Sequence, residues 1–181
     1  PASFYLVKIE AVRIGDSPAA ALFTLITGPS EDSAAASETK RDLVDREKAR
    51  LRFWTNLLEH SKQKTKLHSG ISTSKHGYIG SGAGLPAGLG LNYAVRTHDA
   101  YVELYIDGGT DADQENLDRF NKLLANKEKI ESSLEDEIVW EPLEGKRACR
   151  VSSVVDLGGW KDEEVWGDVI EALVDRMICF D

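Results

Sequence analysis

Two runs of β-forming residues, 91–97 and 100–107, are separated by only two residues, His98 and Asp99. Strands joined by so short a turn lie side by side and antiparallel. A second pair, 139–143 and 148–157, is joined by another short turn in the same way. The sequence therefore predicts a mostly antiparallel sheet.

Apolar residues recur every three or four positions in three other segments, a spacing typical of amphipathic helices. These segments are about 41–64, 110–134 and 162–179, and a short strand at 78–79 lies within the glycine-dense stretch 77–90. From residue 41 the predicted order is α-β-β-β-α-β-β-α. We predict an α+β fold in which the helices cover one face of the sheet.

The N-terminal part of the chain differs in character. Residues 3–13 and 21–27 are rich in β-branched and aromatic types and are separated by turn-forming Gly15–Pro18, which predicts a β-hairpin. Residues 29–40 contain no large apolar side chain and are typical of a linker. We therefore expect a hairpin at 1–28, a linker at 29–40 and an α+β domain at 41–181.

Charge is distributed unevenly around a net value of −9. Residues 40–75 hold ten Lys or Arg against four Asp or Glu, whereas residues 99–181 hold nine against twenty-two. The overall acidity argues against a stand-alone polyanion-binding protein, because affinity for phosphates needs a positive field. The basic segment is compatible with a small basic surface, but an ordinary solvated helix face is the simpler interpretation.

No motif for a cofactor or a metal is present. Gly82 begins a G-x-G-x-x-A match, but a strand rather than a helix is predicted after it, so the pyrophosphate would lack a helix N-terminus. The four histidines are 8, 8 and 22 residues apart, and Cys149 and Cys179 are thirty apart, which fits no metal-binding spacing. We predict that the chain uses no cofactor.

Catalytic motifs are also missing. The sequence contains no G-x-S-x-G element, and no predicted strand carries the acidic-x-Lys pair of a metal-dependent nuclease. We therefore predict that this chain is not an enzyme. An enzyme that acts through the glycine-dense stretch 77–90 is the third and weakest alternative. It has no apolar stretch of about 18 residues and no basic-then-apolar leader, so we expect a cytoplasmic protein that does not enter a membrane.

The strand at 100–107 gives the most informative surface. Its alternation places Glu103 and Tyr105 on the face opposite the helices, and the neighbouring strand adds Arg96 together with Asn92 or Tyr93, depending on register. Such a face is suited to stacking bases, to anchoring a protein partner, or simply to contact with water. The candidate binding residues are Lys62, Lys64, Lys66, Ser74, Lys75, Tyr78, Tyr93, Arg96, Glu103 and Tyr105.

Five segments in order resemble a prokaryotic family, the domain of unknown function 4268, over about residues 41–180. Tyr78 stands where that family often has tryptophan, another flat aromatic ring. The segments that carry the resemblance are Phe53-Trp54, 74–79, 102–107, 123–131 and 146–150.

The N-terminal hairpin carries a second resemblance. Residues 4–10 and 13–18 are similar to the last strands of a restriction-endonuclease-like nuclease domain, which often precedes this family. The resemblance implies an upstream nuclease-like domain in the same protein, with its acidic, metal-holding residues before Pro1. The resemblance therefore implies which kind of domain precedes this chain and implies no activity for the chain itself.

Our leading hypothesis is a non-catalytic accessory domain that helps a nuclease-like protein engage DNA or RNA. It assumes that the lysines near the first helix and the rings on the open sheet face form one continuous patch. The alternative is a protein-interaction or homodimerisation module, favoured by the acidic segment 99–181 and by Trp160 and Trp166 near the start of the last helix.

Overall fold

The computed structural model describes residues 6–13, 17–18, 20–27, 40–82, 84–134, 137–143 and 145–181. The chain divides into two compact units, residues 1–45 and 46–181, which are described separately. Residues 29–39 of the predicted linker lie outside the described residues, and Lys40 begins a helix.

The first unit contains the predicted hairpin. Strand β1 (Leu6–Val12) pairs antiparallel with β2 (Ala20–Thr27), and this register places Ile9 opposite Phe23. These two side chains are 66% and 65% exposed, so the hairpin presents apolar surface to its surroundings. An isolated two-stranded hairpin is marginally stable in water.

The second unit is built on the predicted antiparallel sheet, in the strand order β3-β4-β5-β7-β6. Both predicted strand pairs are confirmed: β4 pairs with β5, and β6 pairs with β7. The strands are β3 (Tyr78–Ser81), β4 (Leu89–Val95), β5 (Ala100–Ile106), β6 (Val139–Glu141) and β7 (Cys149–Val155).

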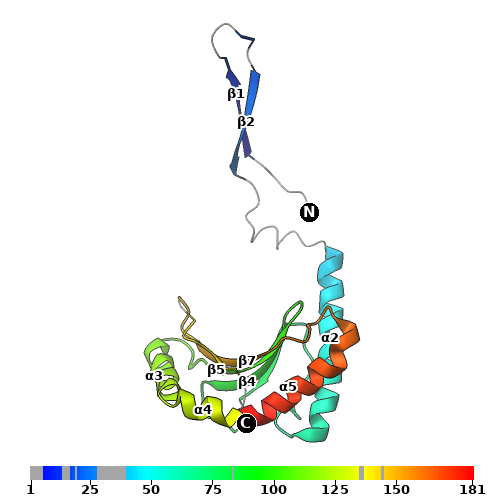
Figure 1. The fold of residues 1–181 in the computed structure, drawn as a ribbon, viewed down its shortest axis with the longest axis vertical. Helices are drawn as coiled ribbons and strands as arrows, with labels where there is room; N and C mark the ends of the chain where they lie inside the picture. The colour runs from blue at the N-terminus through cyan, green and yellow to red at the C-terminus, as the bar shows by residue number, and fades with distance from the viewer. Residues whose placement is uncertain are drawn as a thin grey trace. The chain divides into compact units, whose positions relative to one another are not determined.

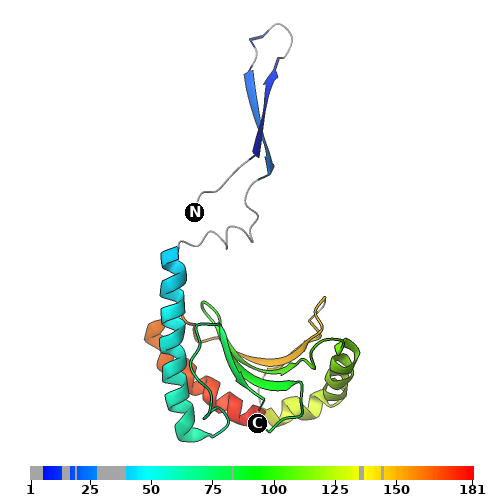
Figure 2. The ribbon, with the colours of Figure 1, turned by 180° about the vertical axis from the view of Figure 1, so that it is seen from behind.

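Helices pack against one face of this sheet, as expected for an α+β fold. Figures 1 and 2 show the sheet as an arc, with α4 and α5 along its outer side and none of the described helices on its inner side. The helical elements are α2 (Lys40–Lys64), α3 (Asp113–Leu124), α4 (Lys127–Leu134), the short 3₁₀ turn η1 (Glu163–Val165) and α5 (Trp166–Phe180).

The single helix predicted at 110–134 is wrong, because two helices occupy that segment. The backbone N–H of Asn126 bonds to the carbonyl of Leu123, which tightens the last turn of α3. The side-chain amide of Asn126 also donates to the carbonyl of Lys122 at 2.9 Å. These bonds satisfy carbonyls at the end of α3, and α4 starts afresh at Lys127.

Two clusters of buried side chains fill the space between sheet and helices. The larger lies under α2 and α5 and includes Phe53, Trp54, Tyr93 and Val102. The smaller is centred on Phe120 and joins α3 to strands β5 and β7. Within the described part of the chain, no helix is both long and apolar enough to cross a membrane.

Candidate functional site

Side chains on the inner face of the sheet form rows that follow the strand register. Asn92, Glu103 and Ser152 lie side by side on β4, β5 and β7 and occupy the middle row. Tyr101 and Tyr105 lie on the same face of β5, one on each side of Glu103, because strand residues two apart share a face. The inner face therefore carries an acidic residue between two aromatic rings.

This face contains a hollow of about 440 Å³. The volume falls within the range of about 300–1,000 Å³ that is common for small-ligand sites. Its lining brings four of the candidate residues together, Tyr78, Arg96, Glu103 and Tyr105. The remaining lining residues are Gly77, Asn92, Ala94, Val95, Tyr101 and Arg150.

Tyr101 lies between two arginines. The Cζ atom of Arg96 is 4.6 Å from the centroid of the Tyr101 ring, and that of Arg150 is 5.3 Å from it. Arg150 also donates from Nη1 to the Tyr101 hydroxyl at 3.2 Å. Contacts of this kind are attractive because the face of an aromatic ring is electron-rich. They hold the ring and both guanidinium groups in fixed positions.

Glu103 is the buried charge of the hollow, only 6% exposed. Asn92 donates from Nδ2 to Glu103 Oε1 at 2.8 Å, and Arg150 Nη1 lies 3.5 Å from Oε2. Arg150 also donates from Nε to Glu141 at 2.8 Å. Two carboxylates thus balance the charge of Arg150. The Arg150 side chain therefore connects Glu103 and Glu141 and is not available to bind an anion.

Arg96 is the more accessible cation. Its side chain is about half exposed and lies 3.3 Å from Asp99 across the β4–β5 turn. Its backbone carbonyl accepts a hydrogen bond from the N–H of Trp160 at 2.9 Å. A Cβ on Gly159 would lie 2.4 Å from that carbonyl oxygen, so only glycine allows this approach. The loop before η1 therefore positions the strand end that carries Arg96.

Two further rings border the hollow. Tyr78 is 61% exposed and stacks on His76, with 6.4 Å between the ring centroids. Tyr105 is partly buried, and burial together with the nearby Asp107 and Glu103 raises the pKa of its hydroxyl. The Tyr105 hydroxyl therefore stays protonated at neutral pH and is able to donate a hydrogen bond.

Gly80 has a structural role that only the cross-strand register reveals. It pairs with Asn92, and a Cβ at Gly80 would lie 1.7 Å from Asn92 Oδ1. The glycine therefore leaves the space in which Asn92 reaches Glu103. Asn92 and Arg150 complete the site; Asn92 was considered only as the alternative to Tyr93, and Arg150 was not a candidate. The one sequence signal for them is polar character at alternate positions of their strands.

Tyr93 does not belong to the site, and its selection as a candidate was wrong. Its side chain faces the helices and is fully buried, 4.7 Å from the ring of His68 between centroids. Burial raises the pKa of Tyr93 to about 12. The register of β4 and β5 places Asn92, and not Tyr93, beside Glu103 on the inner face.

The lysines and the inner face do not form one continuous patch, so that assumption was also wrong. Lys64 Nζ lies 2.6 Å from Asp175 and 3.7 Å from Glu171, both on α5 and therefore on the helix-covered side. The hydrogen bond to Asp175 raises the pKa of Lys64. Lys62 and Lys66 are exposed near the same end of α2 and do not line the hollow.

Ser74 and Lys75 lie just before β3 and also remain outside the hollow. Ser74 Oγ accepts a hydrogen bond from the N–H of His76 at 3.0 Å, which shapes the turn that leads to Tyr78. Lys75 Nζ lies 3.3 Å from a carboxylate oxygen of Glu47. Across the described residues, no three His, Cys, Asp or Glu side chains are grouped so that they could hold a metal ion.

Residues 49–181 match the family described as Domain of unknown function (DUF4268). The chain belongs to the DUF4268 family. The match contains the whole five-stranded sheet, α3, α4 and α5, and therefore the hollow. Searches of curated proteins and of solved structures gave no match. The inner face of the sheet, with its hollow, is therefore the candidate functional site of this DUF4268 domain.

Proposed function

We propose that the DUF4268 domain is a non-catalytic accessory domain that binds single-stranded nucleic acid on the inner face of its sheet. The observation that carries the proposal is the hollow in which Tyr78, Tyr105 and Arg96 surround Glu103. Exposed aromatic rings on an open sheet are a common platform for unpaired bases.

Stacking supplies most of the affinity in this proposal. Tyr78 is exposed at the edge strand, and Tyr105 borders the other side of the Asn92–Glu103 row. Base stacking on an aromatic side chain contributes about 1–3 kcal/mol per base. The Glu103 carboxylate and the Asn92 amide offer hydrogen-bonding groups to the edge of a stacked base.

Electrostatic attraction contributes little to the affinity for nucleic acid in this proposal. Arg150 is balanced by Glu103 and Glu141, Lys64 is paired on the helix-covered side, and the chain carries a net charge of −9. Arg96 is therefore the main group on this face for a phosphate. Because salt dependence reports the number of phosphates neutralised, one contact with a single strand should give a slope of log K against log salt of only about −0.7.

We further propose that the hairpin belongs to a nuclease-like domain that the DUF4268 domain assists. Ile9 and Phe23 face each other across the β1–β2 pair and are both exposed. An apolar face of this kind is stabilised when another layer covers it. The strand sequences resemble the end of a restriction-endonuclease-like domain, which would supply that layer. Paired carboxylates and a lysine upstream of Pro1 would support this part of the proposal.

Fluorescence anisotropy with labelled oligonucleotides of about 12 residues tests the binding function. We expect single-stranded DNA or RNA to bind more tightly than a duplex of the same length, with a weak dependence on salt. Absence of binding at low salt, or a preference for duplex, would contradict the proposal. A concentration-dependent dimer in sedimentation, combined with no nucleic-acid affinity, would favour the protein-interaction module instead.

A further inference from the structure

Helix α4 is unusual because none of its residues is fully buried. It has eight residues, and a helix this short depends on tertiary packing for its stability. Its apolar residues Ile130 and Leu134 are only partly buried and face a space between the helix and the sheet. The packing under α4 is therefore incomplete.

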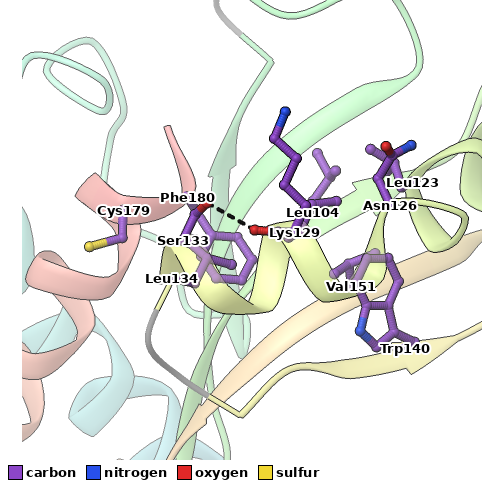
Figure 3. A pocket seen from close by; sticks show the side chains of 11 residues that line it. Leu104, Leu123, Asn126, Lys129, Ser133, Leu134, Trp140, Val151, Cys179 and Phe180 are labelled. Carbon is purple, nitrogen blue, oxygen red and sulfur yellow. Dashed lines mark hydrogen bonds between the residues drawn. The ribbon is translucent and has the colours of Figure 1, made fainter.

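That space is a groove of about 470 Å³ (Figure 3). The sheet contributes Leu104 and Val151 to it, while Ile130 and Leu134 line the side of α4. Phe180 at the end of α5 packs against both core clusters, so the groove lies where the two clusters meet. Its walls come from a helix and a sheet, which makes it a slot rather than a flat surface.

One charged side chain lines this apolar slot, that of Lys129. Figure 3 shows Lys129 extending from α4 beside Leu104, with Phe180 and Trp140 on either side below it. Lys129 forms no ion pair with any residue that the structure describes. By contrast, Lys127 on the same helix lies 3.6 Å from Glu131 and does not line the groove.

We propose that this groove binds an amphiphile with a linear alkyl chain and a carboxylate head group. The alkyl chain lies between α4 and the sheet against Leu104, Ile130 and Phe180, and the carboxylate lies at the ammonium group of Lys129. Burial of the chain removes apolar surface of both partners from water, and the charges are complementary. An alkyl chain fits a slot between two layers, whereas a partner helix about 10 Å wide would have to displace α4.

Isothermal titration of the full chain with hexanoate, octanoate and decanoate tests the apolar part of the site. Each buried methylene contributes about 0.8 kcal/mol, so affinity should rise about fourfold per methylene until the groove is full. Decyltrimethylammonium, which has the same tail and the opposite charge, should bind about tenfold more weakly than decanoate. Absence of saturable binding by all of these compounds would overturn the proposal.

Two adjacent serines provide a matched pair of variants. Ser133 and Ser132 each donate a hydrogen bond to a carbonyl one turn earlier, but only Ser133 lines the groove. Ser133→Phe should fill the slot and abolish decanoate binding. Ser132→Phe should leave the affinity for decanoate within about twofold of the wild-type value. Equal effects of the two changes would contradict the location of the site.

A second pair tests the head group. Lys129→Gln should remove the preference for decanoate over decyltrimethylammonium, while Lys127→Gln should preserve it. Retention of the preference in Lys129→Gln would overturn the assignment of the carboxylate to Lys129. A dimer that Ser133→Phe dissociates, with no amphiphile bound, would instead identify a second copy of the chain as the occupant and would also overturn the proposal.

Discussion

The guanidinium group of Arg96 lies 4.6 Å from the centre of the Tyr101 ring, at the edge of the hollow on the inner sheet face. The contact fixes the direction of a cation that is still about half exposed. It thereby combines a rigid aromatic surface with a charge available to a phosphate.

Arg96→Gln should weaken binding of single-stranded nucleic acid about fivefold and bring the salt slope close to zero, because one phosphate contact is lost. Lys64→Gln is the matched control, since Lys64 is paired with Asp175 on the helix-covered side. It should leave both affinity and salt slope unchanged. Anisotropy titrations at roughly 50 and 200 mM salt measure both quantities.

Tyr78→Ala should reduce affinity by about 1–2 kcal/mol, since the exposed ring is the best placed for stacking. Tyr78→Trp, which has a larger aromatic face, should bind at least as tightly as the wild type. A loss of affinity in both variants would show that the ring is not a stacking surface. The same anisotropy assay distinguishes these outcomes.

Arg150→Ala should lower the free energy of unfolding by about 2–4 kcal/mol, because it leaves Glu103 buried without its cation. Arg147→Ala is the matched control, since its ion pair with Asp107 is more exposed than that of Arg150 with Glu103. We expect a much smaller effect from that change. Urea denaturation of both variants tests the difference.

Gly80→Ala should displace Asn92, since the new Cβ would lie 1.7 Å from the amide oxygen. We expect a loss of about 1–3 kcal/mol in stability together with weaker binding. Gly70→Ala should be tolerated, because nothing lies within 4 Å of a Cβ at that position. Denaturation midpoints that do not differ between the two variants would contradict the role given to Gly80.

Stability should fall as the pH is lowered from about 7 to 5 because of His68. Its ring is 1% exposed, and Nε2 lies 3.1 Å from the carbonyl of Leu91, to which the neutral ring donates. Nδ1 is buried without a described partner, and burial lowers the pKa of His68 below 6.5.

The unfolded chain therefore binds more protons at this residue than the folded chain does at pH values below about 6.5. The resulting loss is at most about 1.4 kcal/mol per pH unit for one group. His68→Gln should flatten this part of the pH profile, whereas His76→Gln, on an exposed side chain, should not. An unchanged slope in His68→Gln would exclude His68 as the cause.

Short-range patterns in the sequence predicted the architecture well. The two-residue connection at His98-Asp99 requires antiparallel neighbours, and β4 and β5 pair accordingly. The break between α3 and α4 was missed because residues 123–131 are compatible with a continuous helix. The interruption depends on the bonds that Asn126 makes to the preceding turn.

The site was predicted only in part, because its assembly depends on contacts between distant residues. Alternation along β5 identified Glu103 and Tyr105, but the choice between Asn92 and Tyr93 required the register of β4. Counting charges near Lys64 could not reveal Asp175, which lies 111 residues further along the chain. Lys64 thus proved to be part of the contact between α2 and α5, whereas Lys62 and Lys66 are exposed.

Ultraviolet cross-linking of a thiouridine-labelled single-stranded RNA to the full chain, with the linked peptides identified by mass spectrometry, tests the central claim most directly. We predict cross-links to Tyr78 and Tyr105 on the inner face, with the Tyr78 cross-link lost in Tyr78→Ala. Cross-links confined to the exposed surfaces of α2 and α5, or no cross-links at low salt, would contradict it.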